Sequence, residues 1–196
     1  MSNLDRKKWD MRYREGAYAE RSHPSVWLVE CLAMMQPPVH MALDLACGAG
    51  RNSLYLASQG YDVDAVDIAA TALLQGSQAA ELASIKSIQW IEQDLDDGLP
   101  DELSGYGLVI MVRYLDIALL REAAKRLVPG GYLLAEVHLQ SDQPVAGPSS
   151  AAFRAAAGEL RSAGADLEII DYSEGLVLDP DGSEVALARL LAQKTE

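Results

Sequence analysis

The residues best suited to chemistry lie in the stretch ALDLACGAGRNSLYLA (42–57), where an acid precedes two glycines. Asp44 closes an apolar run, and Gly48 and Gly50 follow before a segment with helical character. A dinucleotide fingerprint would read GxGxxG, but Ser53 stands where the third glycine would be. A carboxylate at this loop repels a pyrophosphate and accepts hydrogen bonds from an ammonium group. The loop therefore predicts a cationic ligand that lacks phosphate.

Two further acids follow later apolar runs. Asp67 lies near the end of VDAVDI, where a carboxylate typically binds the hydroxyls of a ribose. Asp94 follows SIQWIEQ, and its carboxylate could accept a hydrogen bond from the exocyclic amine of adenine. An ammonium group, a ribose and an adenine together describe S-adenosylmethionine, which is the cofactor we expect.

The elements that must position these acids alternate along the chain. Helices are predicted over residues 4–15 and from about Pro24 to Pro37, the second apolar enough to be buried. Helical segments also separate short predicted strands over residues 40–46, 61–68, 87–93, 106–112 and 132–139. This order predicts a doubly wound α/β fold with a parallel sheet covered on both faces.

The last third of the chain follows a different pattern. An alanine-rich helix is predicted over residues 151–164, and two strands flanking the turn DPDG (179–182) could pair as an antiparallel hairpin at one edge of the sheet. We expect one domain over 1–196, made of an N-terminal helical lid (1–36), a cofactor-binding core (37–138) and a C-terminal helix with edge strands (139–196).

Composition excludes several classes of protein. The formal net charge of −13 over 196 residues disfavours nucleic acid as a partner, and no apolar run is long enough to span a bilayer. The charged N-terminus does not resemble a signal peptide, so we expect a cytoplasmic protein. Two isolated cysteines and three scattered histidines favour neither a disulfide scaffold nor a metal site, and the oligomeric state stays open.

The stretch 42–73 resembles the cofactor-binding segment of class I S-adenosylmethionine-dependent methyltransferases. More narrowly, KWDMRYREGAY (8–18), MVRYLDIALL (111–120) and LVPGGYLLAE (127–136) are similar to the small bacterial methyltransferases grouped with tellurite-resistance and thiopurine-type enzymes. The resemblance covers roughly residues 7–138. It implies a Rossmann-like, mostly parallel seven-stranded sheet with an antiparallel edge hairpin.

The resemblance also implies a role for each matching residue. It places the methionine end of the cofactor near Asp44, Ala46, Gly48 and Gly50. It implies that Asp67 binds the ribose while Ile68 packs on the adenine, and that Asp94 and Leu95 lie at the adenine edge. Arg113 and Tyr114 would lie near the sulfonium, and Trp9 and Tyr13 would belong to a lid over the cofactor.

Methyl transfer from a sulfonium is an in-line displacement that needs no nucleophile on the enzyme. A thiol or thiolate-like acceptor needs little help, whereas a hydroxyl or an amine would need a general base, and we expect an acceptor such as a thiol or an oxyanion. Tyr13, Tyr114 and His138 are the candidates for the acceptor pocket. RYLD follows the fourth strand, in place of the Asp-Pro-Pro-Tyr type of motif used for amine acceptors, which favours a small-molecule acceptor.

Three alternatives stay open. A non-catalytic S-adenosylmethionine-binding protein would keep the same cofactor residues. An NAD-dependent oxidoreductase is disfavoured by Ser53 and by the acid in the first strand. A polyamine-synthase-like enzyme that uses a decarboxylated cofactor would need acids near residue 113, where the chain has an arginine.

Overall fold

The computed structural model describes residues 3–19 and 21–196, so residues 1, 2 and 20 of the predicted lid segment lie outside the described residues. The helices are α1 (Asn3–Arg14), α2 (Val26–Leu32), α3 (Arg51–Ser58), α4 (Ala70–Leu82) and α5 (Ile117–Lys125). The strands are β1 (Met41–Leu45), β2 (Asp62–Asp67), β3 (Ile88–Glu92), β4 (Tyr106–Val112), β5 (Leu127–His138), β6 (Glu168–Leu178) and β7 (Glu184–Gln193). Short 3₁₀ turns lie at η1 (Leu95–Asp97), η2 (Ala151–Phe153) and η3 (Leu160–Gly164).

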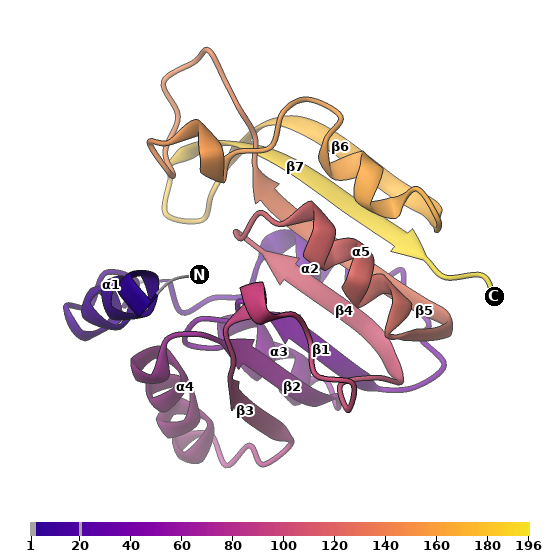
Figure 1. Ribbon diagram of the computed structural model, residues 1–196, viewed down its shortest axis with the longest axis horizontal. Coiled ribbons are helices and arrows are strands. Elements are labelled where there is room, and N and C mark those ends of the chain that lie inside the picture. The colour runs from indigo at the N-terminus through magenta and orange to yellow at the C-terminus, as the bar shows by residue number, and fades with distance from the viewer. Residues whose placement is uncertain (1–2, 20) are drawn as a thin grey trace.

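The strands form one sheet in the order β3-β2-β1-β4-β5-β7-β6 (Figure 1). Strands β1 to β5 run parallel, whereas β7 runs antiparallel to both β5 and β6. This order confirms the predicted fold class, a doubly wound and mostly parallel sheet with an antiparallel edge hairpin. The carboxyl ends of β1, β2 and β4 are neighbours, which brings the loops after these strands to one edge.

Alternating side chains along the strands fill two cores. Leu43 and Leu45 of β1 face the layer formed by α5 and η3, whereas Ala42 faces the layer formed by α2, α3 and α4. Each face of the sheet therefore buries its own set of apolar residues, as a doubly wound sheet requires.

Of the predicted helical lid, only α1 lies outside these layers. The buried residues Trp27, Leu28 and Cys31 of α2 belong to the core beneath the sheet, as the apolar pattern of this segment predicts, whereas the lid role of residues 1–36 stays a prediction. Helix α1 packs beside α4 (Figure 1). There the Asp10 carboxylate accepts a hydrogen bond from Thr71 N at 2.9 Å, in a first turn of α4 that has no side-chain cap of its own.

The predicted C-terminal helix is wrong. The segment 151–164 contains only the 3₁₀ turns η2 and η3, because Ala155 between them forms a parallel bridge with Leu139 next to β5. Ala155 N donates to His138 O at 2.7 Å, and Gly158 adopts a left-handed φ of 77°, which an α-helix cannot contain. Pairing with β5 therefore overrides the helix propensity of the alanines.

A buried hydrogen bond supports β2 and β4 across β1. The Tyr106 hydroxyl donates to Asp64 Oδ2 at 2.6 Å, and both residues are buried. We expect Tyr106→Phe to lower the free energy of unfolding by about 1–3 kcal/mol, because it leaves a buried carboxylate without its donor. Urea denaturation at pH 7 measures the change. The half-buried Tyr55 is the control: Tyr55→Phe should change stability little, and an equal loss in both variants would contradict the interpretation.

Candidate functional site

The Asp67 carboxylate connects the end of β2 to the glycine loop after β1. Its Oδ2 accepts from Gly48 N at 2.7 Å, and its Oδ1 accepts from Ala69 N at 2.8 Å. Burial raises the pKa of Asp67, and the N–H groups of Ala69 and Gly48 oppose that rise. A carboxylate offers about four lone-pair sites, so Asp67 can also accept a hydrogen bond from a ligand.

Asp44 lies deeper, within β1. It is 1% exposed, and its Oδ2 accepts a short hydrogen bond of 2.6 Å from the Ser53 hydroxyl. Burial raises the pKa of Asp44 to about 7, against the effect of the Ser53 hydrogen bond. Ser53 therefore serves as the donor to Asp44, a role that its position in the broken glycine fingerprint did not reveal. Whether Asp44 meets a ligand stays a prediction.

The two glycines of the loop are needed for different reasons. A Cβ on Gly48 would lie 2.2 Å from Tyr13 Oη, so the Tyr13 hydroxyl of α1 lies against the loop backbone. A Cβ on Gly50 would lie 2.3 Å from the Trp90 ring, and Gly50 has a left-handed φ of 74° at the start of α3. Packing against Trp90 and the turn into α3 thus explain Gly50 without any ligand.

The residues predicted for the adenine follow the ends of β2 and β3. Ile68 and Leu95 are both buried, and Asp94 Oδ1 accepts from Asp96 N at 3.1 Å as the cap of η1. Burial raises the pKa of Tyr114 to about 12, with Asp116, Asp94 and Asp67 adding to the rise. The structure thus brings Tyr114 into the same neighbourhood as Asp67 and Asp94.

The predicted lid residues differ in what they contact. Burial, followed by Asp67, raises the pKa of Tyr13, which is consistent with its position over the loop. Trp9 instead lies near Tyr18, with ring centroids 6.3 Å apart, and under the Arg12 guanidinium at 5.2 Å. Tyr13 therefore reaches the glycine loop, whereas Trp9 has its ring contacts with Arg12 and Tyr18 of the N-terminal segment.

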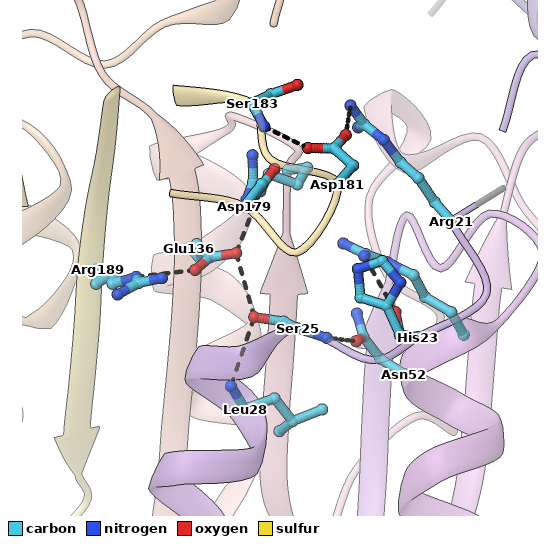
Figure 2. A network of polar contacts seen from close by, with 12 residues as sticks. Arg21, His23, Ser25, Leu28, Asn52, Glu136, Asp179, Asp181, Ser183 and Arg189 are labelled. Carbon is cyan, nitrogen blue, oxygen red and sulfur yellow. Dashed lines mark hydrogen bonds and ion pairs between the residues drawn. The ribbon is translucent and has the colours of Figure 1, made fainter. Parts of the chain in front are cut away.

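A second cluster surrounds Glu136 at the end of β5. Its Oε1 accepts from Arg113 Nε at 3.1 Å and from Ser25 Oγ at 3.2 Å, and its Oε2 accepts from Arg189 Nε at 2.9 Å. Figure 2 shows Ser25 and Arg189 directed at the Glu136 carboxylate, with Asp179 on the turn between β6 and β7. Arg113 Nη2 donates to Asp179 Oδ1 at 2.7 Å, which fixes this turn to the end of β4.

A cavity of about 230 Å³ lies beside this cluster, and its lining includes Arg21, Ser25, Arg51, Arg113 and Glu136. Of the predicted cofactor residues, Arg113 alone lines it. Arg113 has a left-handed φ of 65° and a buried Nη1 with no hydrogen-bond partner among the described residues. Ala46, also predicted for the cofactor, has a left-handed φ of 53° in the glycine loop. Sequence reasoning missed Arg51 and Glu136 as site residues, although Arg51 directly follows the glycine loop.

His138 has different neighbours from Tyr13 and Tyr114, the other two candidates for the acceptor pocket. A Cβ on Gly147 would lie 2.5 Å from its ring, and its buried Nδ1 has no partner among the described residues. Burial, followed by Arg113 and Arg154, lowers the pKa of His138 to about 4. The imidazole is therefore neutral at pH 7 and a weak base. Among the described residues, no group of three or more His, Cys, Asp or Glu could hold a metal ion, and no helix could cross a membrane.

The raised pKa of Asp44 predicts how stability depends on pH. The folded state binds a proton at Asp44 up to pH about 7, whereas the unfolded chain releases it near pH 3.8. Stability should therefore fall as pH rises through this window, by up to a few kcal/mol at about 1.4 kcal/mol per pKa unit. The free energy of unfolding is measured by urea denaturation at pH 5 and at pH 8. It should fall less from pH 5 to pH 8 in Asp44→Asn than in the wild type. Asp62→Asn, at the exposed start of β2, should keep the wild-type difference, and equal slopes in all three proteins would refute the assignment.

Known proteins resemble this chain along most of its length. It is 27% identical over 162 residues to the "Probable S-adenosyl-L-methionine-dependent methyltransferase TehB" of Haemophilus influenzae, covering 78% of this chain and 56% of that protein. It is 32% identical over 168 residues to "Hemagglutinin 1" of Eikenella corrodens, covering 78% and 54%. The chain thus spans a little over half the length of these curated relatives.

A solved structure and a family profile agree with these relatives. The crystal structure of TehB from Haemophilus influenzae superimposes with a TM-score of 0.72 at 25% identity, covering 86% of this chain and 61% of that one. The profile described as "Tellurite resistance protein TehB" matches residues 12–180, which include the glycine loop, Asp67, Arg113 and Glu136. The chain therefore belongs to the TehB family of tellurite resistance proteins.

Proposed function

We propose that this protein binds S-adenosylmethionine and transfers its methyl group to a small-molecule acceptor. The observation that carries the proposal is the Asp67 carboxylate, which lies at the end of β2 and is hydrogen-bonded to Gly48 N in the loop after β1. An acid at this position suits the hydroxyls of a ribose, and the loop carries an acid where a dinucleotide fold carries none. The name of the Haemophilus influenzae relative supports the same cofactor.

The residues around the loop fit such a cofactor. Asp67 can accept from a ribose through its remaining lone pairs, and Ile68, Asp94 and Leu95 lie at the neighbouring strand ends for the adenine. Asp44 is covered by Ser53, so we assign it an electrostatic role behind the ammonium group, without direct contact. Tyr13, over Gly48, would cover the cofactor from α1.

When bound, the cofactor would supply a methyl group on a positively charged sulfur, which an in-line nucleophile can displace. The candidate acceptor residues are Tyr13, Tyr114 and His138, and none of them is a good general base at pH 7. The pKa values of both tyrosines are raised, so their hydroxyls stay protonated, and that of His138 is lowered to about 4. We therefore infer that these residues position the acceptor, and that the acceptor is a thiol or an oxyanion that supplies its own lone pair.

Calorimetric titration with S-adenosylhomocysteine tests the cofactor assignment. We expect micromolar binding and no binding of NAD. Asp67→Asn should weaken the binding about 10- to 100-fold, because it removes charge-assisted hydrogen bonds worth about 1.5–3 kcal/mol. Asp62→Asn lies at the opposite end of β2 and should bind like the wild type. Binding of NAD in place of S-adenosylhomocysteine would overturn the proposal and favour an oxidoreductase.

The pH dependence of turnover tests the inference about the acceptor. With a panel of thiols that differ in pKa, kcat/KM should rise with pH along the ionisation of each thiol, since no enzyme base takes up the proton. His138→Asn should retain this profile with folding checked by circular dichroism. If kcat/KM instead rose around the same pH for every acceptor, and this rise disappeared in His138→Asn, His138 would be identified as a base. Failure of every thiol and oxyanion to react would favour a non-catalytic binding protein.

A further inference from the structure

The loop after β5, residues 139–148, lies against the ring of His138. A Cβ on Gly147 would lie 2.5 Å from this ring and 2.7 Å from its Nδ1, so the loop backbone covers the imidazole directly. Gly147 also has a left-handed φ of 115°, which suits glycine. His138 is 6% exposed, and its buried Nδ1 has no partner among the described residues. We call residues 139–148 the cover loop.

Arg154 ties the two arms of the cover loop together through main-chain carbonyls. Its Nε donates to Pro148 O at 2.8 Å, its Nη1 to Leu139 O at 3.0 Å and its Nη2 to Ala146 O at 3.2 Å. The first acceptor along the chain directly follows β5, and the other two lie on the returning arm. A planar guanidinium can donate in three directions at once, which an ammonium on a flexible stem does less well.

Further hydrogen bonds attach the cover loop to its surroundings. On the returning arm, Ala146 N donates to Glu184 O at 2.9 Å, at the start of β7. On the outgoing arm, Gln140 N donates to Ala155 O at 2.9 Å. Between these points the side chains of residues 141–144 are exposed. The loop therefore depends on a few polar contacts and not on a core of its own.

Two opposed contributions act on the closed loop. Burial of the His138 Nδ1 without a partner is unfavourable, and movement of the loop away from the ring would hydrate this nitrogen. The hydrogen bonds from Arg154 favour the closed position. Segments with few buried apolar contacts are the ones that open most readily in folded proteins, and loops that cover active sites belong to this class.

We propose that the cover loop is a gate over His138, and that Arg154 is the positioning residue that holds the gate closed. The closed loop excludes water from the carboxyl end of β5, where water would compete with the acceptor. The open loop lets the acceptor reach His138 and the product leave. The role of His138 toward the acceptor rests on the proposed function, whereas the gate itself does not.

Modification by diethyl pyrocarbonate measures whether the loop is closed. The reagent acylates an accessible, unprotonated histidine nitrogen, and peptide mass spectrometry gives the rate at each histidine. At pH 7.5 without cofactor, wild-type His138 should react at least about tenfold more slowly than the exposed His40. Arg154→Lys should raise the rate at His138 about tenfold or more, because it keeps the positive charge but loses most of the three-way contact.

Gly147→Ala should open the gate by a different route. The added Cβ would overlap the His138 ring, so the loop must move away and the rate at His138 should rise as in Arg154→Lys. Arg121→Lys is the matched control, because Arg121 also donates to a main-chain carbonyl, Ser162 O, at 3.2 and 3.0 Å. It should leave the rate at His138 unchanged. Circular dichroism checks the fold of each variant.

The pKa of His138 gives a second readout, which a general loss of stability would not move. Arg113, Arg21 and Asp179 face the imidazole besides Arg154, and burial is the largest cause that lowers its pKa to about 4. Arg154→Lys keeps these charges and reduces the burial, so the pKa should rise toward the ordinary value of 6.5. The NMR shift of the ring Cε1–H, followed against pH, measures this change.

The inference is wrong if wild-type His138 reacts as fast as His40, or if a folded Arg154→Lys or Gly147→Ala variant keeps the slow wild-type rate. S-adenosylhomocysteine should bind both variants within about twofold of the wild type, because the cover loop follows β5 and not β1 or β2. A loss as large as that expected for Asp67→Asn would contradict a gate on the acceptor side. Failure of the wild type to bind S-adenosylhomocysteine would overturn the proposed function, whereas the histidine rates alone decide the gate.

Discussion

The hydrogen bond between the Asp67 carboxylate and Gly48 N is the interaction on which the candidate site depends. It joins the end of β2 to the loop after β1, and the second oxygen of the same carboxylate accepts from Ala69 N before α4. Parallel strands bring these ends together, but the carboxylate determines how closely the loop approaches β2. Because the loop is held against β2, the Tyr13 hydroxyl of α1 can lie against Gly48.

Charge is distributed unevenly over this edge of the sheet. The side at β2 and β3 carries the acids Asp67 and Asp94, whereas the side at β4 and β5 carries arginines arranged around Glu136. Burying a carboxylate is costly unless cations and hydrogen-bond donors compensate its charge. Glu136 forms ion pairs with Arg113 and Arg189, which compensate its charge and hold both arginines in place.

The sheet could be predicted from the sequence because short apolar runs alternate with helical segments from residue 40 to residue 139. Residues 151–164 could not, because the bridge between Leu139 and Ala155 is a long-range contact that overrides local helix propensity. The acids of the site were found because they lie at or near the carboxyl ends of apolar strands. Ser53 and Glu136 were missed as partners, since hydrogen bonds between distant residues leave no spacing signal, and Gly50 proved to be required by Trp90.

A crystal structure of the protein with S-adenosylhomocysteine tests the central claim most directly. We expect the ribose hydroxyls on the Asp67 carboxylate and the amino acid portion along Gly48 to Gly50. A ligand bound elsewhere, or ribose hydroxyls that make no contact with Asp67, would contradict this assignment of the site.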